Sequence, residues 1–214
     1  PRYLGRQPVA ERETVGHQIV HRGAHHAQGT QADGHPFWIR VIGDAEPGDP
    51  GASRITGTMQ DISQDKQAEE TLRIQARTDP LTGLMNRDAV LTELGARLAD
   101  PERAQVAVLY IDLDRFKIVN DVLGHAAGDR MLAAAARRIQ RAVASEGLIA
   151  RFGGDEFLVI CDAGDDPRRP EDLAHAVLGA FADSFRFGKD EFAITTSIGL
   201  AIAPGDGLRP QQLI

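Results

Sequence analysis

The longer, C-terminal part of the chain alternates short apolar runs with longer amphipathic segments. Apolar runs of strand length lie at residues 106–111, 148–152, 157–161 and 194–202. Segments with helical spacing of apolar residues lie between them, at residues 116–122, 131–143 and 172–185. The first run is apolar throughout, which is typical of a strand buried on both faces. The order β-α-α-β-β-α-β predicts an α/β fold of the α+β type, a sandwich with a mainly antiparallel central sheet.

The N-terminal part predicts a small antiparallel β segment. The strand-like residues 37–42 follow a hairpin-turn signal at Asp33-Gly34. Residues 46–51 are rich in Pro, Gly and Asp and predict a loop, and residues 54–60 alternate polar with apolar or small residues. We therefore expect two or three antiparallel strands before residue 61.

The composition changes between these two parts. Residues 62–78 are rich in Glu, Lys, Gln, Arg and Ala, and Ala68, Leu72 and Ala76 lie four residues apart. This spacing predicts a helix with one narrow apolar stripe, which is too thin to cover a full core. We interpret the helix as a linker and keep two alternatives open: it pairs with a copy of itself, or it is a solvated connector.

Charge restricts the class of partner. The 214 residues carry 24 basic and 31 acidic side chains, a net charge of −7. Affinity for a nucleic-acid polymer needs clustered excess Lys and Arg, so we expect no such partner.

Cysteine usage and hydropathy bear on the compartment. The single cysteine, Cys161, excludes an internal disulfide framework and fits a reducing compartment. The chain has no signal peptide, and no apolar run approaches the roughly 18 residues of a membrane span, so we expect a cytoplasmic location. Because the chain begins at Pro1, we also expect it to be a piece of a longer protein, whose full length can include a membrane anchor or further domains.

Four carboxylates predict the place of the chemistry. Asp112 and Asp114 directly follow the first buried run, and Asp155 and Glu156 lie at the turn between the next two strands. If these strands are neighbours, both pairs converge at one edge of the sheet, where they repel unless a hard divalent cation offsets their charge. The usual partner of such an ion is a nucleoside triphosphate, and Gly153-Gly154 lets a ligand approach the backbone. The alternative is that these are ordinary solvated acidic turns.

Five motifs, in order, resemble those of GGDEF-domain diguanylate cyclases. They lie at residues 79–87 (DPLTGLMNR), 112–121 (DLDRFKIVND), 124–129 (GHAAGD), 151–157 (RFGGDEF) and 196–201 (TSIGLA). Residues 79–214 are therefore expected to form a GGDEF domain that lacks the last helix and strand of the family. Residues 1–61 resemble the C-terminal strands of a PAS sensory domain, ending near Asp61-Ile62-Ser63, and residues 62–78 are then a helical signalling linker.

The resemblance implies an enzyme, a diguanylate cyclase that condenses two GTP molecules into cyclic di-GMP and two pyrophosphates with Mg²⁺, or alternatively Mn²⁺. It implies a palm-like fold shared with other nucleotide cyclases and with polymerases. One domain presents one site while the product joins two nucleotides twice, so the simplest arrangement is a two-fold homodimer with facing sites. A PAS-type input is expected to regulate it, and receptors of cyclic di-GMP are expected downstream. Because the last helix of the family carries basic residues that contact the triphosphate, this chain alone is expected to be a weak catalyst.

The motifs also imply roles for individual residues. The implied metal ligands are Asp112, Asp155 and the backbone carbonyl of Leu113. The implied substrate contacts are Asn120 and Asp129 with guanine, Phe116 and Lys117 with the phosphates, and Gly153 and Gly154 along the nucleotide. Either Asp155 or Glu156 is implied to help remove the proton from the attacking 3′-hydroxyl. Many family members carry an inhibitory Arg-x-x-Asp motif, but those positions read Ala144-Ser145-Glu146-Gly147 here, so no product-inhibition site is expected.

Two other functions stay open. A catalytically silent GGDEF domain can act as a receptor for GTP or cyclic di-GMP, and a sensory dimerisation module can act through protein contacts alone. The presence of the implied metal and guanine ligands favours the enzyme.

Overall fold

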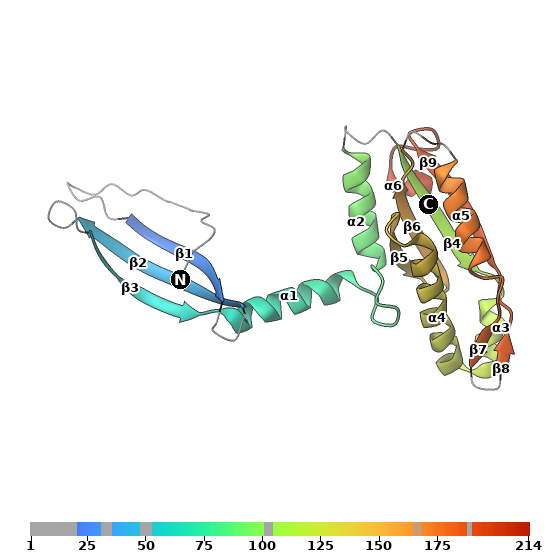
Figure 1. Cartoon of the computed structure of the whole chain (residues 1–214), viewed down its shortest axis with the longest axis horizontal. Helices are drawn as coiled ribbons and strands as arrows, with labels where there is room; N and C mark the ends of the chain where they lie inside the picture. Colours follow the sequence, from blue (N-terminus) through green and yellow to red (C-terminus); the bar gives the residue numbers. More distant parts are fainter. Residues whose placement is uncertain are drawn as a thin grey trace. The chain divides into compact units, whose positions relative to one another are not determined.

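The computed structural model describes residues 21–30, 36–47, 53–100, 105–164, 166, 168–187 and 190–214 of the chain. The chain divides into two compact units, Pro1–Arg73 and Ile74–Ile214, and the boundary falls within a helix. Figure 1 labels the helices and strands of both units.

The described part of the first unit is an antiparallel sheet in the order β1-β2-β3. Its strands are β1 (His21–Thr30), β2 (Pro36–Pro47) and β3 (Ser53–Asp61). The strands expected at residues 37–42 and 54–60 are confirmed within β2 and β3. The expected start of the following loop is wrong, because Glu46 and Pro47 still pair with β3 at the end of β2. Two parts of the sequence prediction lie outside the described residues, Asp33-Gly34 and residues 48–51.

Helix α1 (Ser63–Arg77) follows β3 and matches the expected linker helix to within one residue at each end. Its start is held against β2, because the Ile62 N–H donates to the Trp38 carbonyl (2.9 Å) and the Trp38 N–H donates to Ser63 Oγ (2.8 Å). The Ile62 side chain is fully buried. Beyond this junction, no α1 side chain is buried in the described chain, and Leu72 is 65% exposed. The apolar stripe of α1 is therefore open to solvent in the single chain.

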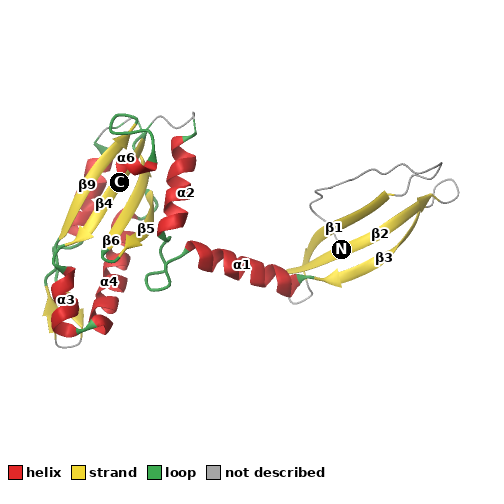
Figure 2. Cartoon of the chain, turned by 180° about the vertical axis from the view of Figure 1, so that it is seen from behind, coloured by secondary structure: helices red, strands yellow, loops and turns green. Residues whose placement is uncertain are grey.

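The second unit is built on an antiparallel sheet in the order β5-β6-β4-β9 (Figure 2). Its strands are β4 (Val106–Leu113), β5 (Gly147–Gly153), β6 (Glu156–Asp162) and β9 (Thr196–Ala203). One face packs against helices α3 (Phe116–Leu123), α4 (His125–Val143) and α5 (Arg169–Gly179). The other face packs against α2 (Arg87–Leu98) and α6 (Pro210–Leu213). The fold is thus the mixed α/β sandwich with an antiparallel central sheet that the sequence predicts.

The second unit also contains a short β-hairpin. Strands β7 (Phe185–Phe187) and β8 (Asp190–Phe192) form the hairpin and lie beside α3 in Figures 1 and 2. In the parts of the chain that the structure describes, no helix is long and apolar enough to cross a bilayer.

Strand β4 is buried on both faces, as its unbroken apolar run predicts. Leu109 and Ile111 alternate in direction with Val106 and Val108, and the two sets belong to the separate cores on the two faces of the sheet. Asp112 lies on the same face of the strand as Val108 and is the first acidic residue after the apolar run. The position of this carboxylate is therefore fixed by a strand that cannot slip without exposing its core residues.

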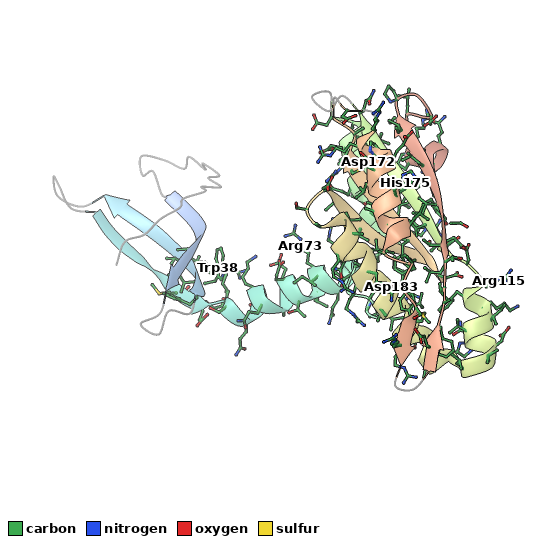
Figure 3. All side chains as sticks on the ribbon, turned by 45° about the vertical axis from the view of Figure 1, so that its right-hand side comes forward. Trp38, Arg73, Arg115, Asp172, His175 and Asp183 are labelled. Atoms are coloured by element: carbon green, nitrogen blue, oxygen red, sulfur yellow. The ribbon has the colours of Figure 1, made fainter. Side chains whose placement is uncertain are left out.

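Two helices depart from their predicted limits. Helix α4 begins at residue 125 rather than 131, and α5 ends at 179 rather than 185. The end of α5 is set by Arg138 of α4, whose guanidinium donates to the carbonyls of Ala180 (3.2 Å) and Ser184 (2.7 Å). The same group lies 3.6 Å from the centre of the Phe185 ring, which already belongs to β7. Asp183, labelled in Figure 3, lies in the short connection that Arg138 holds in place.

Candidate functional site

The exit of β4 and the turn between β5 and β6 meet at one edge of the sheet. Asp112 lies directly opposite Glu156 in the β4–β6 ladder. The Leu113 N–H donates to the carbonyl of Asp155 at 3.3 Å, so the main chain ties the two segments together. Three of the four carboxylates that the sequence singles out therefore lie together.

The electrostatics of this edge favour a bound cation. The pKa of Asp112 is raised, first by burial and then by the negative charges of Asp155 and Glu156. Each of these effects disfavours the charged form of Asp112, and a divalent cation offsets them. Mg²⁺ suits this donor set, because it is usually held by one or two carboxylates and takes its remaining oxygens from water and substrate phosphates. The described residues contain no group of three or more His, Cys, Asp or Glu side chains arranged to hold a metal ion.

Asp114 lies at the same edge, and its charge also raises the pKa of Asp112, but its carboxylate is bound to residues at the start of β9. Its carboxylate accepts hydrogen bonds from Thr195 Oγ1 (2.5 Å) and Ser197 Oγ (2.7 Å) at the start of β9. The pKa of Asp114 is lowered, chiefly by the Thr195 hydrogen bond and then by the Ser197 hydrogen bond. The pKa values of Asp112 and Asp114, two residues apart, are thus shifted in opposite directions.

The glycine turn is fixed by an arginine and open on its outer side. Arg151 donates through Nε (3.0 Å) and Nη2 (2.8 Å) to the carbonyl of Gly154. Gly154 has φ +50°, in the left-handed region that favours glycine, and a Cβ there would meet nothing within 4 Å. A Cβ at Gly153 would lie 3.6 Å from the Glu156 carboxylate. The turn therefore presents bare backbone beside the acidic group, where a ligand can approach closely.

The residues expected to read guanine lie on α3 and α4, which approach each other very closely. A Cβ at Gly128 would lie 1.9 Å from Asn120 Oδ1 and 3.1 Å from Cζ of Phe116, so any larger residue at this point of α4 would require Asn120 to move. Asn120 is thereby held against the segment that carries Asp129, which is itself exposed. The sequence assigned no role to Gly128, although a glycine inside a helix one residue before an implied ligand was the available signal.

The expected phosphate contacts divide into a buried and an exposed residue. Phe116 is 6% exposed and its ring belongs to the core, so its main chain is the part that can reach a phosphate, whereas the side chain of Lys117 is exposed. The residue before them, Arg115, has φ +60°, and no side chain caps the start of α3. The Ile118 N–H donates to the Arg115 carbonyl (2.9 Å), so the N–H groups of Phe116 and Lys117 are those without a cap at this helix start, the kind of position that can receive phosphates.

A hollow of about 800 Å³ lies beside α3. The hollow is lined by Asp112, Asp114 and Arg115, by apolar side chains of α3, and by residues 191–195. Figure 3 shows Arg115 at the start of α3. Asn120 and Asp129 do not line this hollow, so the residues implied for guanine and the hollow are separate places.

Known proteins with this fold share most of the second unit. A family model described as "Diguanylate cyclase, GGDEF domain" matches residues 76–214. A sensory box/GGDEF family protein from Caulobacter crescentus CB15 is 39% identical, with a TM-score of 0.60 over 64% of this chain and 90% of that structure. The coiled coil and GGDEF domain of DgcB from Caulobacter crescentus, solved in complex with c-di-GMP, is 29% identical, with a TM-score of 0.61 over 69% of this chain and 80% of that structure.

Curated relatives are much longer than this chain. Cyclic di-GMP phosphodiesterase PdeR from Escherichia coli (strain K12) is 37% identical over 147 residues, which are 69% of this chain and 22% of PdeR. Two further relatives are also named cyclic di-GMP phosphodiesterases. The chain spans 13–24% of the length of the curated relatives that it matches.

The antiparallel sheet with its acidic edge defines the class, a domain with the nucleotide-cyclase fold. Within that class, the chain belongs to the GGDEF family.

Proposed function

We propose that this chain carries diguanylate cyclase activity and forms cyclic di-GMP and two pyrophosphates from two GTP molecules. The observation that carries the proposal is the meeting of Asp112, Asp155 and Glu156 at the edge of the sheet, with the pKa of Asp112 raised by its neighbours. In-line attack on an α-phosphate needs neutralised charge and a positioned nucleophile more than it needs a covalent intermediate. This edge provides places for both.

The proposed metal ligands are Asp112, Asp155 and the carbonyl of Leu113. Mg²⁺, or alternatively Mn²⁺, supplies positive charge that offsets the triphosphate and the developing charge at the reacting phosphorus. The carboxylates hold that charge next to the glycine turn, where the backbone of Gly153 and Gly154 allows the nucleotide to approach. Either Asp155 or Glu156 accepts the proton of the attacking 3′-hydroxyl as the new P–O bond forms and pyrophosphate leaves.

Guanine selectivity is proposed to come from Asn120 and Asp129. The Asp129 carboxylate can accept from the N1–H and N2–H₂ of guanine, groups that adenine does not offer. Hydrogen bonds to a charged group contribute about 1.5 to 3 kcal/mol each, so a pair suffices for roughly hundredfold selectivity. The uncapped N–H groups of Phe116 and Lys117 at the start of α3 are proposed to receive the phosphates.

The assembly is proposed to be a two-fold homodimer in the cytoplasm, where GTP is available. Each domain contributes one half-site, so two must face each other to close both phosphodiester bonds. Residues 1–61 are proposed to be a PAS-like input that acts through α1, and receptors of cyclic di-GMP are the proposed downstream partners.

The alternative is a silent GGDEF domain that binds GTP or cyclic di-GMP without turnover. One observation favours it: three relatives that match this chain are named phosphodiesterases of cyclic di-GMP, and the match covers only part of each. In such a protein the GGDEF domain need not be the catalytic part.

Product analysis separates the two. Purified chain is incubated with GTP and Mg²⁺, and nucleotides are resolved by chromatography with mass detection. We expect cyclic di-GMP from the wild type and from the control Asp172→Asn on α5, and none from Asp155→Asn, because an amide is a poorer Mg²⁺ ligand and no base. Bound but unchanged GTP in the wild type supports the receptor instead, and normal turnover by Asp155→Asn contradicts the assigned site.

A further inference from the structure

Asp114 is the carboxylate that the proposed chemistry leaves without a task. It lies just beyond the last paired residue of β4, and its N–H donates to the Thr195 carbonyl (3.0 Å), which extends the β4–β9 pairing by one step. Its side chain turns back across this pairing and accepts from both Thr195 Oγ1 and Ser197 Oγ. The chain then leaves the sheet through Arg115, in the left-handed region, and enters α3.

Three consecutive hydroxyls at the start of β9, those of Thr195, Thr196 and Ser197, donate to Asp112 and Asp114 in different ways. Ser197 lies directly opposite Asp112 in the ladder, yet its hydroxyl donates to Asp114. Thr196 Oγ1 donates to the main-chain carbonyl of Asp112 (2.7 Å). Among the described residues no hydrogen bond reaches the carboxylate of Asp112. Three consecutive hydroxyls thus fix the main chain of Asp112 and the side chain of Asp114, and leave the Asp112 carboxylate available.

We propose that Asp114 is a positioning residue that orients Asp112 and the carbonyl of Leu113 toward the metal and sets where α3 begins. The inference rests on the proposed function. Because Asp114 is already satisfied by two hydroxyl donors, it does not compete with Asp112 and Asp155 for the cation. Its role is exerted through the main chain on either side of it.

The fold does not depend on this contact, which separates positioning from general stability. Strands β4 and β9 pair over residues 106–113, and Leu109, Ile111 and Leu113 are fully buried. Asp114, in contrast, lies at the open end of the ladder. Loss of its hydrogen bonds frees the loop after Leu113 while the sheet remains, and partners that orient metal ligands typically affect metal affinity or activity by roughly 10- to 100-fold.

The test compares Asp114→Ala, Asp114→Asn and the double variant Thr195→Val/Ser197→Ala. The readouts are kcat, KM for GTP, the Mg²⁺ concentration at half-maximal rate, and Tm. We expect Asp114→Ala and the double variant to lower kcat and raise the Mg²⁺ requirement by roughly tenfold or more, with KM for GTP changed less. Asp114→Asn should recover part of kcat and part of the normal Mg²⁺ requirement, because the amide oxygen still accepts a hydrogen bond.

Asp206→Ala is the matched control. Asp206 also accepts a hydrogen bond on β9, from the Ile202 N–H (2.7 Å), but at the other end of the strand. The Asp206→Ala variant should lower Tm without changing the Mg²⁺ requirement. An unchanged Mg²⁺ requirement in Asp114→Ala overturns the proposal. So does an Asp114→Asn variant as inactive as Asp155→Asn, which identifies Asp114 as a direct ligand.

Failure of the cyclase proposal remains distinguishable. If the wild type forms no cyclic di-GMP, the Mg²⁺ dependence of GTP binding is measured by titration calorimetry in the same variants. A Mg²⁺ requirement raised in Asp114→Ala and not in Asp206→Ala then supports the positioning role in a receptor. Equal Mg²⁺ requirements in the two variants overturn it.

Discussion

Arg151 and Asp79 lie 72 residues apart in the sequence and form an ion pair of 3.2 Å, with both side chains more than four-fifths buried. The same guanidinium donates to the carbonyl of Gly154, next to Asp155. Asp79 also accepts from the N–H (2.8 Å) and hydroxyl (2.6 Å) of Thr82, which closes the turn after α1. One arginine therefore connects the end of the linker helix to the turn that carries the proposed metal ligand.

Replacing this arginine is predicted to affect both stability and turnover. Arg151→Met leaves the Asp79 carboxylate without its cation and the Gly154 carbonyl without two donors, so we expect a loss of about 1–3 kcal/mol in the free energy of unfolding and a marked fall in rate. The control is Arg186→Met, whose pair with Glu191 is largely exposed and should contribute less than about 1 kcal/mol. Urea unfolding and product formation measure the two effects. Equal stabilities of the two variants would contradict this account of the ion pair.

The same contact predicts a pH dependence of stability. Burial raises the pKa of Asp79, but the hydrogen bonds from Thr82 and the charge of Arg151 outweigh it and hold the pKa below its ordinary value of 3.8. The unfolded chain therefore takes up this proton first as the pH falls, so the contribution of Asp79 is complete above about pH 4 and is lost as the pH falls further. The stability difference between wild type and Asp79→Asn should be constant above about pH 5 and should shrink between about pH 4 and pH 2. A constant difference in urea unfolding over that range contradicts the pairing.

The close approach of α3 and α4 predicts a specific intolerance. Gly128→Ala places a methyl group against the Asn120 amide, so Asn120 must move; we expect a higher KM for GTP and a loss of about 1–3 kcal/mol in stability. Gly95→Ala in α2 is the control, since a Cβ there meets nothing within 4 Å. It should gain about 0.5–1 kcal/mol from helix propensity and leave KM unchanged. An unchanged KM in Gly128→Ala would show that Asn120 does not contact the nucleotide.

Product inhibition is predicted to be absent at residues 144–147. Glu146 pairs with Arg169 at 3.5 Å, and a Cβ at Gly147 would lie 2.8 Å from the Ile160 carbonyl, so no aspartate fits at that position. Cyclic di-GMP should therefore not lower the initial rate by binding at residues 144–147. Restoring the motif with Ala144→Arg/Gly147→Asp should lower Tm without creating inhibition. Tight binding of cyclic di-GMP that disappears in Glu146→Ala would contradict the prediction.

The linker helix is predicted to transmit a signal through the pairing of two copies. The stripe of α1 is narrow, Ala-rich and exposed, so its pairing should be weak and easily changed. Two residues inserted after Glu70 rotate the stripe by about 200° and should change activity strongly, whereas seven inserted residues restore its direction to within about 20° and should not. Equal rates in both variants would make α1 a passive connector.

The sequence predicted the sheet and the acidic edge because both depend on local pattern. The apolar run ending at Ile111 specifies a doubly buried strand, and the next residue, Asp112, must then lie at its exit. The glycine turn places Asp155 and Glu156 beside β6, and their convergence with Asp112 required β6 to pair with β4, a condition that the sequence left open and the structure meets.

The parts that the sequence did not predict depend on distant partners. The end of α5 is set by Arg138, more than forty residues away, and the hydrogen bonding of Asp114 is set by the hydroxyls of Thr195 and Ser197, more than eighty residues away. Helix α2 was missed although Ala89, Val90 and Leu94 are buried; its start depends on the Asn86 cap, which accepts from the Ala89 N–H. Such contacts leave no periodicity in the residues that they affect.

The most direct test of the central claim is the amount of cyclic di-GMP that the chain forms from GTP as Mg²⁺ is increased, measured for wild type and Asp112→Asn. The claim that the acidic edge is a metal-dependent cyclase site predicts that product formation by the wild type depends on Mg²⁺, with two pyrophosphates released per cyclic di-GMP, and that Asp112→Asn forms none while retaining its fold. Mg²⁺-independent product, or equal product from both proteins, would contradict it.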